Sequence, residues 1–401
     1  MSLAKELIQE NVDVKNRTRT NIFQWRGQFT PQLITYLLGN FASEKDIIVD
    51  PFSGSGTVLL ESALKDLSCF GFEISPAAYA MSQFFSFANF KDTVRKEIFS
   101  GTEEKIIRLI NDNDLLPFST DENNLSLEKQ NRFSDFTKLL VANLESKEEK
   151  IIALNTLFHC AKSKNRNFLE VLQVSLTNIK NELLRLPYTE KKISCFLADA
   201  RLAHLKCPAK ANLIITSPPY INVFNYHQNY RTIVEAAGWN VLKVAPSEFG
   251  SNRKHRGNRF KTVIQYCLDM EEAFYSFWHL LQSAGTLIII IGKESNVLKV
   301  PFYNGQIVRD IIQEAKGYKE IGMYQRSFLN KFGSNIEEEI IVLQKTSQPP
   351  NLNVASAVAN KHLRFALRAA NEEIKQQIQA AINDLDFVKP SPIFHYEENV
   401  F

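Results

Sequence analysis

Residues 216–220 place a threonine, a serine, two prolines and a tyrosine directly after the apolar run 213–215. Each proline fixes its own φ near about −65° and lacks an N–H, so the chain leaves the strand rigid and extended, with carbonyl oxygens open to a ligand. Ser217 Oγ and the Pro218 carbonyl can then accept hydrogens from an exocyclic amine of a nucleobase, which releases the amine's lone pair toward an incoming methyl group, while Tyr220 stacks on the base. In-line positioning would supply most of the barrier reduction without a general base. The alternative is a diproline turn that only ends a strand beside a surface tyrosine.

A second group of residues suits a cofactor. Residues 46–50 resemble a short buried strand that runs into the glycine-rich turn 51–57, and a helical pattern follows. Glycines at 54 and 56 allow close approach of a ligand, and Glu73 follows the next strand at about the 20-residue distance of a ribose partner. This spacing indicates an adenosine-containing cofactor. Neither G-x-G-x-x-G nor a G-K-S/T ending is present, which disfavours a dinucleotide or a phosphate loop.

The elements that must position these residues form one sheet in our prediction. Apolar runs alternate with helical patterns, which is typical of a doubly wound α/β sheet. Both motifs then fall at the carboxyl ends of neighbouring strands, where ligands bind in such folds. The predicted strands are residues 46–49, 68–72, 193–197, 212–215, 286–291, 319–324 and 339–343.

At these two motifs the chain resembles the S-adenosylmethionine-dependent amino-methyltransferases that act on DNA. Residues 50–57 resemble the cofactor loop of that family, and residues 217–220, Ser-Pro-Pro-Tyr, resemble its catalytic tetrapeptide. Residues 29–33 resemble the element that holds the methionine end of the cofactor, and residues 197–200 resemble the strand end whose aspartate meets the adenine amine. The resemblance covers about the first eighty residues and residues 193–345.

The resemblance implies a Rossmann-like doubly wound sheet of the class I methyltransferase type, with S-adenosyl-L-methionine as cofactor and double-stranded DNA as substrate. A serine at the first tetrapeptide position favours cytosine N4 over adenine N6 as the methylated atom. The resemblance implies catalytic roles for Ser217, Pro218, Pro219 and Tyr220. It implies cofactor contacts from Phe29, Thr30, Asp50, Pro51, Phe52, Ser53, Gly54, Gly56, Thr57, Glu73, Asp199 and Ala200.

The order of the two motifs differs from one common arrangement in the family. Serine-type enzymes with this cofactor loop often place the catalytic segment first, whereas here the loop at Asp50 precedes Ser217. A circular permutation leaves the three-dimensional site unchanged. The order therefore puts in doubt only the location of the target-recognition region.

Basic residues gather in one segment although the net charge is only +3. Residues 243–262 carry seven basic or histidine side chains and one acid, and they are rich in Gly, Ser and Asn, so we predict a flexible loop that clamps DNA phosphates. The alternative is a solvated loop without specific partners. The predicted DNA contacts are Arg253, Lys254, Arg256, Arg259 and Lys261.

The remaining sequence defines the expected domains. Residues 1–79 and 193–345 form the cofactor-binding and catalytic domain, which contains the basic loop 222–262. Residues 80–192 contain amphipathic helices, at 133–144, 150–162 and 168–186, and form an inserted lobe for target recognition, or equally a scaffold or dimer face. Residues 346–401 form a C-terminal extension with one helix over 355–385 and no assigned activity.

Composition excludes other classes. With 44% hydrophobic and 23% charged residues, the chain has the composition of a globular protein, and it has neither an apolar signal core nor a run long enough for a membrane span. We therefore predict a cytoplasmic protein. Five scattered cysteines without C-x-x-C and seven histidines without ligand spacing predict free thiols and no metal.

Four functions remain open. The preferred one is cytosine-N4 methylation of duplex DNA by base flipping, in a restriction-modification system with a cognate endonuclease. Adenine-N6 methylation of DNA, guanine-N2 methylation of RNA and a non-catalytic DNA-binding module are the alternatives. The recognition sequence and the oligomeric state do not follow from the sequence.

Overall fold

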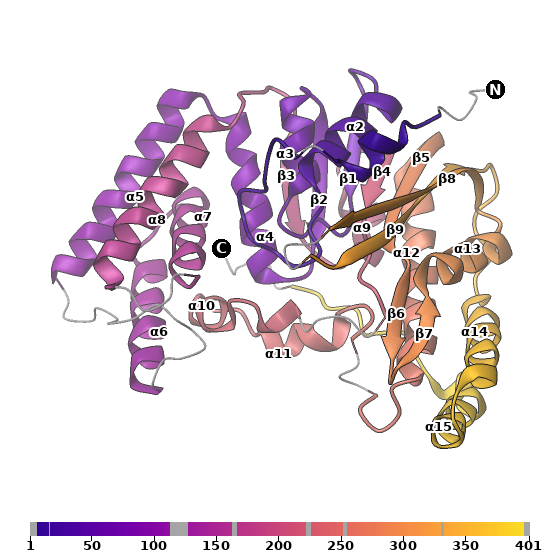
Figure 1. The fold of residues 1–401 in the computed structure, drawn as a ribbon. Coiled ribbons are helices and arrows are strands. Elements are labelled where there is room, and N and C mark those ends of the chain that lie inside the picture. Colours follow the sequence, from indigo (N-terminus) through magenta and orange to yellow (C-terminus); the bar gives the residue numbers. More distant parts are fainter. Residues whose placement is uncertain are drawn as a thin grey trace.

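A seven-stranded sheet forms the centre of the computed structural model (Figure 1), which describes residues 6–15, 17–112, 127–162, 167–221, 226–251, 255–329 and 333–396, without the side chains of 127–131. The strand order is β3-β2-β1-β4-β5-β9-β8. The strands are β1 (Ile47–Asp50), β2 (Ser68–Glu73), β3 (Ile193–Leu197), β4 (Ala211–Thr216), β5 (Leu281–Gly292), β8 (Tyr318–Leu329) and β9 (Asn335–Lys345).

Strands β1 to β5 run parallel, β9 pairs antiparallel with β5, and β8 pairs antiparallel with β9. The strand order steps outward from β1 toward β3 on one side and from β4 on the other, so β1 and β4 meet where the winding reverses. All seven predicted strands are present within a few residues of their predicted bounds. The structure thus confirms a Rossmann-like doubly wound α/β sheet of the class I methyltransferase type with added helices.

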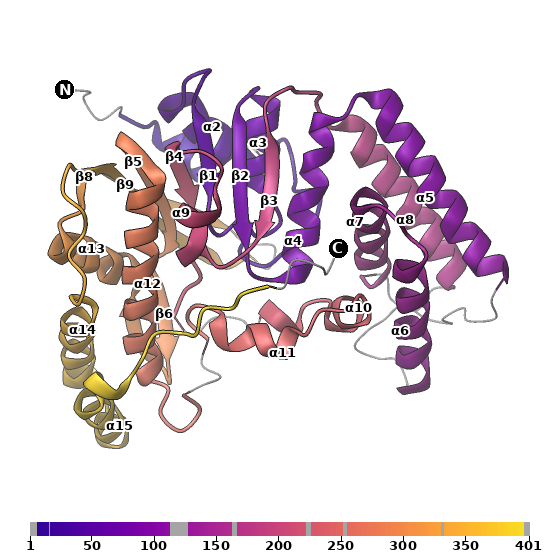
Figure 2. The ribbon, with the colours of Figure 1, turned by 180° about the vertical axis from the view of Figure 1, so that it is seen from behind.

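Burial on both faces explains why these strands read as continuous apolar runs. In β5, Ile288 and Ile290 belong to one hydrophobic cluster, and Leu287, Ile289 and Ile291 belong to the other. The first face is covered by α2 (Pro31–Phe41), α3 (Thr57–Leu64) and α4 (Pro76–Gln83). The second face, toward the viewer in Figure 2, is covered by α9 (Ala203–Lys206), α12 (Lys261–Leu280) and α13 (Asn304–Ala315).

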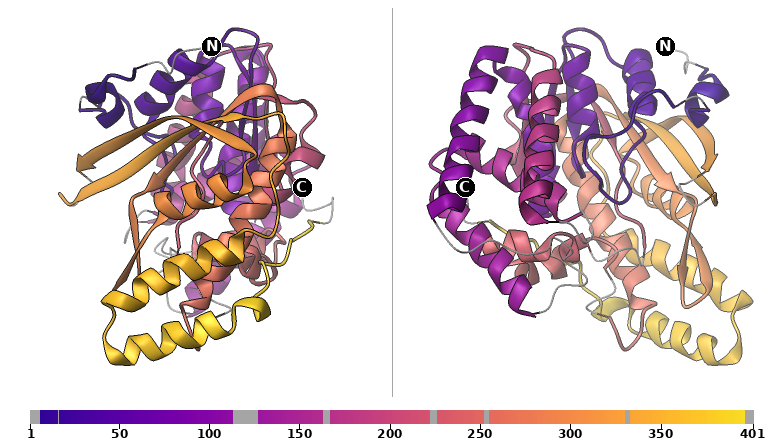
Figure 3. Two further views of the ribbon diagram at one scale, coloured as in Figure 1. Left: turned by 90° about the vertical axis from the view of Figure 1, so that its right-hand side faces the viewer. Right: turned by 60° about the vertical axis from the view of Figure 1, so that its left-hand side comes forward.

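Residues 92–185 form a helical lobe beside the β3 edge of the sheet (Figure 3, right). Its helices are α5 (Asp92–Asp112), α6 (Leu127–Ala142), α7 (Lys147–Cys160) and α8 (Phe168–Arg185). Local chemistry sets two of the helix starts. Ser146 and Glu149 form a capping box at α7, and Asn167 accepts a hydrogen bond from Leu169 N at the start of α8.

In the described part of the segment predicted as a flexible basic loop, short helical elements occupy much of residues 226–247, which corrects the sequence prediction there. Short helices α10 (Arg231–Ala236) and α11 (Val241–Val244) pass under the sheet between the lobe and α12, and the 3-10 turn 245–247 follows. Val244, Ala245 and Phe249 are buried, so their apolar contacts hold the first part of the segment against the domain. Only the part near 255–259 keeps a mostly open character.

The C-terminal extension holds two helices where one was predicted, α14 (Ala355–Ala369) and α15 (Glu372–Asn383). Asn371 has an extended conformation between them, and its side chain accepts from Ile374 N to start the second helix. After a short 3-10 turn, residues 388–396 cross the lower edge of the sheet from α15 toward α4 (Figure 2). The other elements are α1 (Gln9–Asp13) and the hairpin β6 (Glu294–Val297) and β7 (Val300–Tyr303), which the sequence pattern did not predict.

Within the residues that the structure describes, none of the helices combines the length and apolar character needed to cross a bilayer.

Candidate active site

The two motifs singled out from the sequence lie side by side because β1 and β4 are paired neighbours. Asp50 ends β1 and Thr216 ends β4, and Thr216 Oγ1 donates a hydrogen bond of 2.6 Å to Asp50 Oδ1. The same hydroxyl accepts from Phe52 N at 3.2 Å. Thr216 therefore fixes the glycine-rich turn relative to the diproline turn, a role that its place in the sequence did not reveal.

Asp50 is completely buried, and this burial raises its pKa to about 7. Its carboxylate serves the turn rather than the cavity, because Oδ1 accepts from Thr216 and from Phe52 N. Asp50 does not line the cavity described below. The structure thus places Asp50 behind the cofactor loop.

Glycine is required at position 56 by both conformation and space. Gly56 has φ 88°, and a Cβ there would lie 2.6 Å from Phe85 Cδ2 and 2.9 Å from Ser82 Cα. Gly54 also has a positive φ, 52°, and a Cβ on it would lie 3.4 Å from Trp25 Cδ1. The turn is therefore packed between α4 and the segment that contains Trp25, and it cannot move outward to admit a side chain.

Replacing Gly56 with Ala should lower the free energy of unfolding by about 2–4 kcal/mol, because the left-handed φ and the overlap with Phe85 both act against a Cβ. Urea denaturation followed by circular dichroism measures this loss. Gly101→Ala in α5 is the matched control, since a Cβ there meets nothing within 4 Å. The control should be neutral or raise stability by up to about 1 kcal/mol, and equal losses in the two variants would contradict this explanation.

Glu73 at the end of β2 holds the same turn through its carboxylate. One oxygen accepts from Gly54 N at 2.8 Å and the other from Ser75 N at 2.7 Å. Burial raises the pKa of Glu73 to about 8, against the effect of these two hydrogen bonds. Each carboxylate oxygen keeps acceptor capacity toward the cavity that Glu73 lines.

One cavity, partly open to solvent, lies at the carboxyl ends of β1, β2, β3 and β4. It brings together most of the predicted site residues. Those that line it are Phe29, Pro51, Phe52, Ser53, Gly54, Thr57, Glu73, Asp199, Ala200, Ser217 and Pro219. Thr30, Asp50, Gly56, Pro218 and Tyr220 are not among the lining residues.

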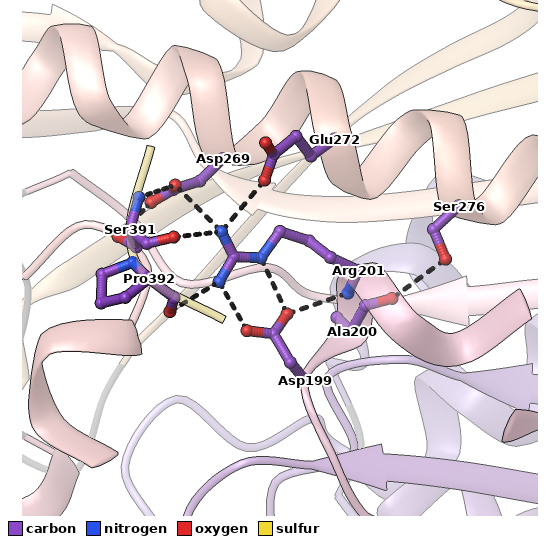
Figure 4. Close-up of polar contacts among 8 residues, drawn as sticks. All are labelled: Asp199, Ala200, Arg201, Asp269, Glu272, Ser276, Ser391 and Pro392. Carbon is purple, nitrogen blue, oxygen red and sulfur yellow. Dashed lines mark hydrogen bonds and ion pairs between the residues drawn. The ribbon is translucent and has the colours of Figure 1, made fainter. Parts of the chain in front are cut away.

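Asp199 lies in this lining, but its carboxylate is engaged by a neighbour (Figure 4). Arg201 donates to Asp199 through Nε at 2.9 Å, through Nη2 at 2.6 Å and through its backbone N–H at 2.9 Å. The side chains of both residues are about 1% exposed. Any ligand that meets Asp199 therefore meets a carboxylate whose position is set by Arg201.

Tyr220 packs against two glycines instead of pointing freely into the cavity. A Cβ on Gly292 would lie 2.6 Å from Tyr220 Cε2, and one on Gly250 would overlap the Tyr220 carbonyl oxygen. Burial raises the pKa of Tyr220 far above its ordinary value. Two close glycine contacts thus fix the tyrosine ring and its backbone next to the diproline turn.

The cavity also contains residues to which the sequence analysis assigned no cofactor contact. The rings of Trp25 and Tyr226 stack with centroids 6.0 Å apart and an angle of 18°. Gln28 Oε1 accepts from Trp25 N and from Ser55 Oγ, which joins the N-terminal segment to the turn. The remaining additions are Arg26, Gly27, Ser55, Phe72, Ile74, Ser75, Ser247, Glu248 and Phe249. In the sequence, the one local sign that Trp25 could belong to the site is its position next to Arg26, shortly before Phe29.

The predicted DNA contacts do not form one uniform cluster. Arg253 and Lys254 lie outside the described residues. Arg256 and Arg259 are exposed, as a phosphate contact requires. Lys261 instead forms an ion pair of 2.6 Å with Asp384 near the end of α15, because α12 begins at this residue and packs beside the C-terminal helices.

Parts of this sequence are similar to known proteins. Residues 6–84, which include the glycine-rich turn, match the DNA methylase family profile. Over these residues the chain is similar to DNA methylases. A Type II methyltransferase of Methanocaldococcus jannaschii, M.MjaII, is 40% identical over 76 residues, 18% of this chain and 14% of that protein. M.BsoBI of Geobacillus stearothermophilus, also a Type II methyltransferase, is 25% identical over 279 residues, 57% of this chain and 55% of that protein.

These matches confirm the family resemblance drawn from the sequence, and with it S-adenosyl-L-methionine as the expected cofactor. The chain covers little more than half of the length of M.BsoBI and about a seventh of the length of M.MjaII. Similar solved structures include TrmN from Thermus thermophilus, which is 13% identical in sequence and has a TM-score of 0.31. The match covers 80% of this chain and 50% of that chain. A SAM-dependent methyltransferase from Methanosarcina mazei has 8% identity, 78% of this chain, 98% of that chain and a TM-score of 0.35. Likenesses this distant carry no argument about function.

Proposed function

We propose that this protein transfers the methyl group of S-adenosylmethionine to the exocyclic N4 of cytosine in duplex DNA. One observation carries the proposal: the glycine-rich turn after β1 and the diproline turn after β4 open onto one cavity. A cofactor held by the first turn and a base held by the second can therefore meet. Cytosine rather than adenine rests on the serine at position 217 alone.

The cavity residues fit the proposed cofactor. Glu73 offers carboxylate oxygens to two ribose hydroxyls, while Gly54, which lines the cavity without a side chain, lets a ligand approach the backbone of the turn. Glu73 and Glu248 together give the wall an acidic character, which favours a cationic sulfonium. When bound, the cofactor supplies an electrophilic methyl group.

The protein's own groups position the acceptor. Ser217 Oγ and the Pro218 carbonyl accept the two hydrogens of the amine, so its lone pair points away from the ring system and toward the cavity. Tyr220 supplies a stacking surface for a base extruded from the duplex, at a cost of a few kcal/mol that DNA contacts must offset. Arg256 and Arg259 are the described basic residues that we assign to phosphates.

A methyl-transfer assay tests this proposal. Purified protein, labelled cofactor and mixed genomic DNA should give labelled duplex DNA, and nucleoside mass spectrometry should find N4-methylcytosine. N6-methyladenine would place the activity on adenine, and preferential labelling of transfer RNA over DNA would overturn the DNA substrate. The Ser217→Ala variant is the control, and it should bind cofactor but transfer little.

The Type II names of the two relatives favour a cytoplasmic restriction-modification setting with a cognate endonuclease as partner.

Cofactor affinity should rise with pH because the ionised form of Glu73 is the one that accepts ribose hydroxyls and attracts the sulfonium. Burial raises the pKa of Glu73 to about 8, so below that pH binding must first displace a proton. The dissociation constant, measured by calorimetry, should fall by up to about tenfold per pH unit between about pH 6 and pH 8 and then level off.

The Glu73→Gln variant separates this effect from that of Asp50, whose pKa is about 7. The variant should bind more weakly and should lose most of the pH dependence. An unchanged pH dependence in Glu73→Gln would assign it to another group.

A further inference from the structure

The C-terminal segment 388–396, for which the sequence analysis found no role, is fastened at two points to the walls of the cavity. It lies more than a hundred residues from every cavity residue in the sequence, and Figure 2 shows it crossing the edge of the sheet where the strands end. The two attachments involve Ser391 and Tyr396. Each attachment leads to a residue that lines the cavity.

The first attachment is a buried polar cluster (Figure 4). Ser391 donates to Asp269 through its backbone N–H and through Oγ, both at 2.6 Å. Arg201 donates to the Ser391 carbonyl at 2.7 Å and to the Pro392 carbonyl at 3.1 Å. The same guanidinium holds Asp199 through Nε and Nη2. The tail therefore completes the set of acceptors that fixes Arg201, and Arg201 fixes Asp199 in the cavity wall.

The buried cluster leaves little freedom to Arg201. The guanidinium also contacts Asp269 at 3.5 Å and Glu272 at 3.1 Å, and its centre lies 5.1 Å from the Phe249 ring centroid. Phe249 itself lines the cavity. A buried guanidinium is held in one orientation when each of its N–H groups has an acceptor. The Ser391 and Pro392 carbonyls supply two of the acceptors for Arg201.

The second attachment lies next to Glu73. Tyr396 Oη donates to the backbone carbonyl of Ile74, which lines the cavity and directly follows Glu73. Burial raises the pKa of Tyr396, and the carboxylates of Glu73, Glu248 and Asp199 raise it further, so the ring lies close to the acidic wall. Tyr396 thus fixes the short turn 73–75, in which the Glu73 carboxylate also accepts from Ser75 N.

We infer that residues 388–396 form an outer wall of the cofactor cavity and position Ile74 and Asp199 for the adenosine half of the ligand. This inference rests on the proposed function for the identity of that ligand. Glu73, Ile74 and Asp199 follow β2 and β3, whereas the methyl-accepting turn follows β4. The tail therefore governs affinity for adenosine and leaves the transfer step unchanged. Tyr396 and Ser391 are positioning residues.

Binding measurements with Tyr396→Phe test the inference, because this change removes one hydroxyl and keeps the ring. Calorimetry with S-adenosylmethionine and with methylthioadenosine, which lacks the amino-acid part, should show the same loss of affinity for both, about three- to tenfold. The turnover number with genomic DNA at saturating cofactor should match that of the unaltered protein. Lys389→Ala, an exposed change in the same segment, should bind both ligands normally.

Three outcomes would overturn the inference. Unchanged affinity in Tyr396→Phe would show that the tail does not shape the cavity. A loss confined to S-adenosylmethionine would place the effect at the methionine end. A loss of turnover at saturating cofactor would give the tail a role in transfer. If the unaltered protein binds neither ligand, the proposed function itself fails. The same titrations therefore distinguish failure of the proposed function from failure of the inference about the tail. Equal thermal midpoints for Tyr396→Phe and Lys389→Ala would exclude a general loss of folding.

Discussion

Replacing Tyr220 with Ala should lower the turnover number for DNA methylation on the order of 100-fold, while the affinity for S-adenosylmethionine stays unchanged. Loss of the stacking surface removes about 1–3 kcal/mol of base binding and frees the target amine from its in-line position. Because Tyr220 is not among the residues that line the cavity and packs against Gly292 and Gly250, the change leaves the cofactor walls in place. Single-turnover kinetics with labelled cofactor and calorimetry measure the two effects separately.

Two variants serve as controls for this result. Tyr220→Phe keeps the ring and should retain most of the turnover. Glu73→Ala should show the reverse pattern, a large loss of cofactor affinity with a smaller loss of turnover at saturation. If Tyr220→Ala and Glu73→Ala weaken cofactor binding equally, the separate assignment of the two turns is wrong.

Replacing Arg95 with Ala should lower the free energy of unfolding by at least about 3 kcal/mol, the largest stability effect that we expect. Arg95 is only 1% exposed and donates to the backbone carbonyls of Phe87 and Phe90 on one side. On the other side it donates to carbonyls at the end of α8, those of Leu183, Leu186 and Pro187. The guanidinium therefore joins the helical lobe to the segment after α4, and without it these carbonyls stay buried and unsatisfied.

Urea denaturation followed by far-ultraviolet circular dichroism measures this loss. Arg108→Ala is the matched control in the same helix, because Arg108 is exposed and, among the described residues, forms its ion pair with Glu104 one turn away. The control should change stability by no more than about 0.5 kcal/mol. Arg95→Lys should fall between the two, since an ammonium cannot reach all these carbonyls. A loss in Arg95→Ala no larger than in Arg108→Ala would refute the anchoring role.

The sheet and the two turns could be predicted because their causes are local. Apolar runs such as 287–291 define strands buried on both faces, and Pro218, Pro219, Gly54 and Gly56 restrict or free the backbone where they stand. We could also predict that the two turns lie next to each other, because ligand sites in doubly wound sheets lie at the carboxyl ends of adjacent strands. The pairing of β1 with β4 confirms that neighbourhood.

Local patterns failed where a contact joins distant segments. A helical pattern over 355–385 did not show that Asn371 would start a second helix. Composition alone made residues 243–262 look like an open loop, although Glu248 and Phe249 pack into the cavity wall.

Taken by itself, the sequence determined the doubly wound sheet, the glycine-rich turn and the diproline turn, because backbone restriction and apolar periodicity act over a few residues. Only the tertiary structure decided which side chains complete the cavity. Arg201 holds Asp199, Thr216 joins the two turns, and Tyr396 reaches Ile74 across 322 positions of sequence. Such hydrogen bonds depend on how the helices and the tail pack against the sheet, and no periodicity or spacing rule encodes a partner that the chain meets only after folding.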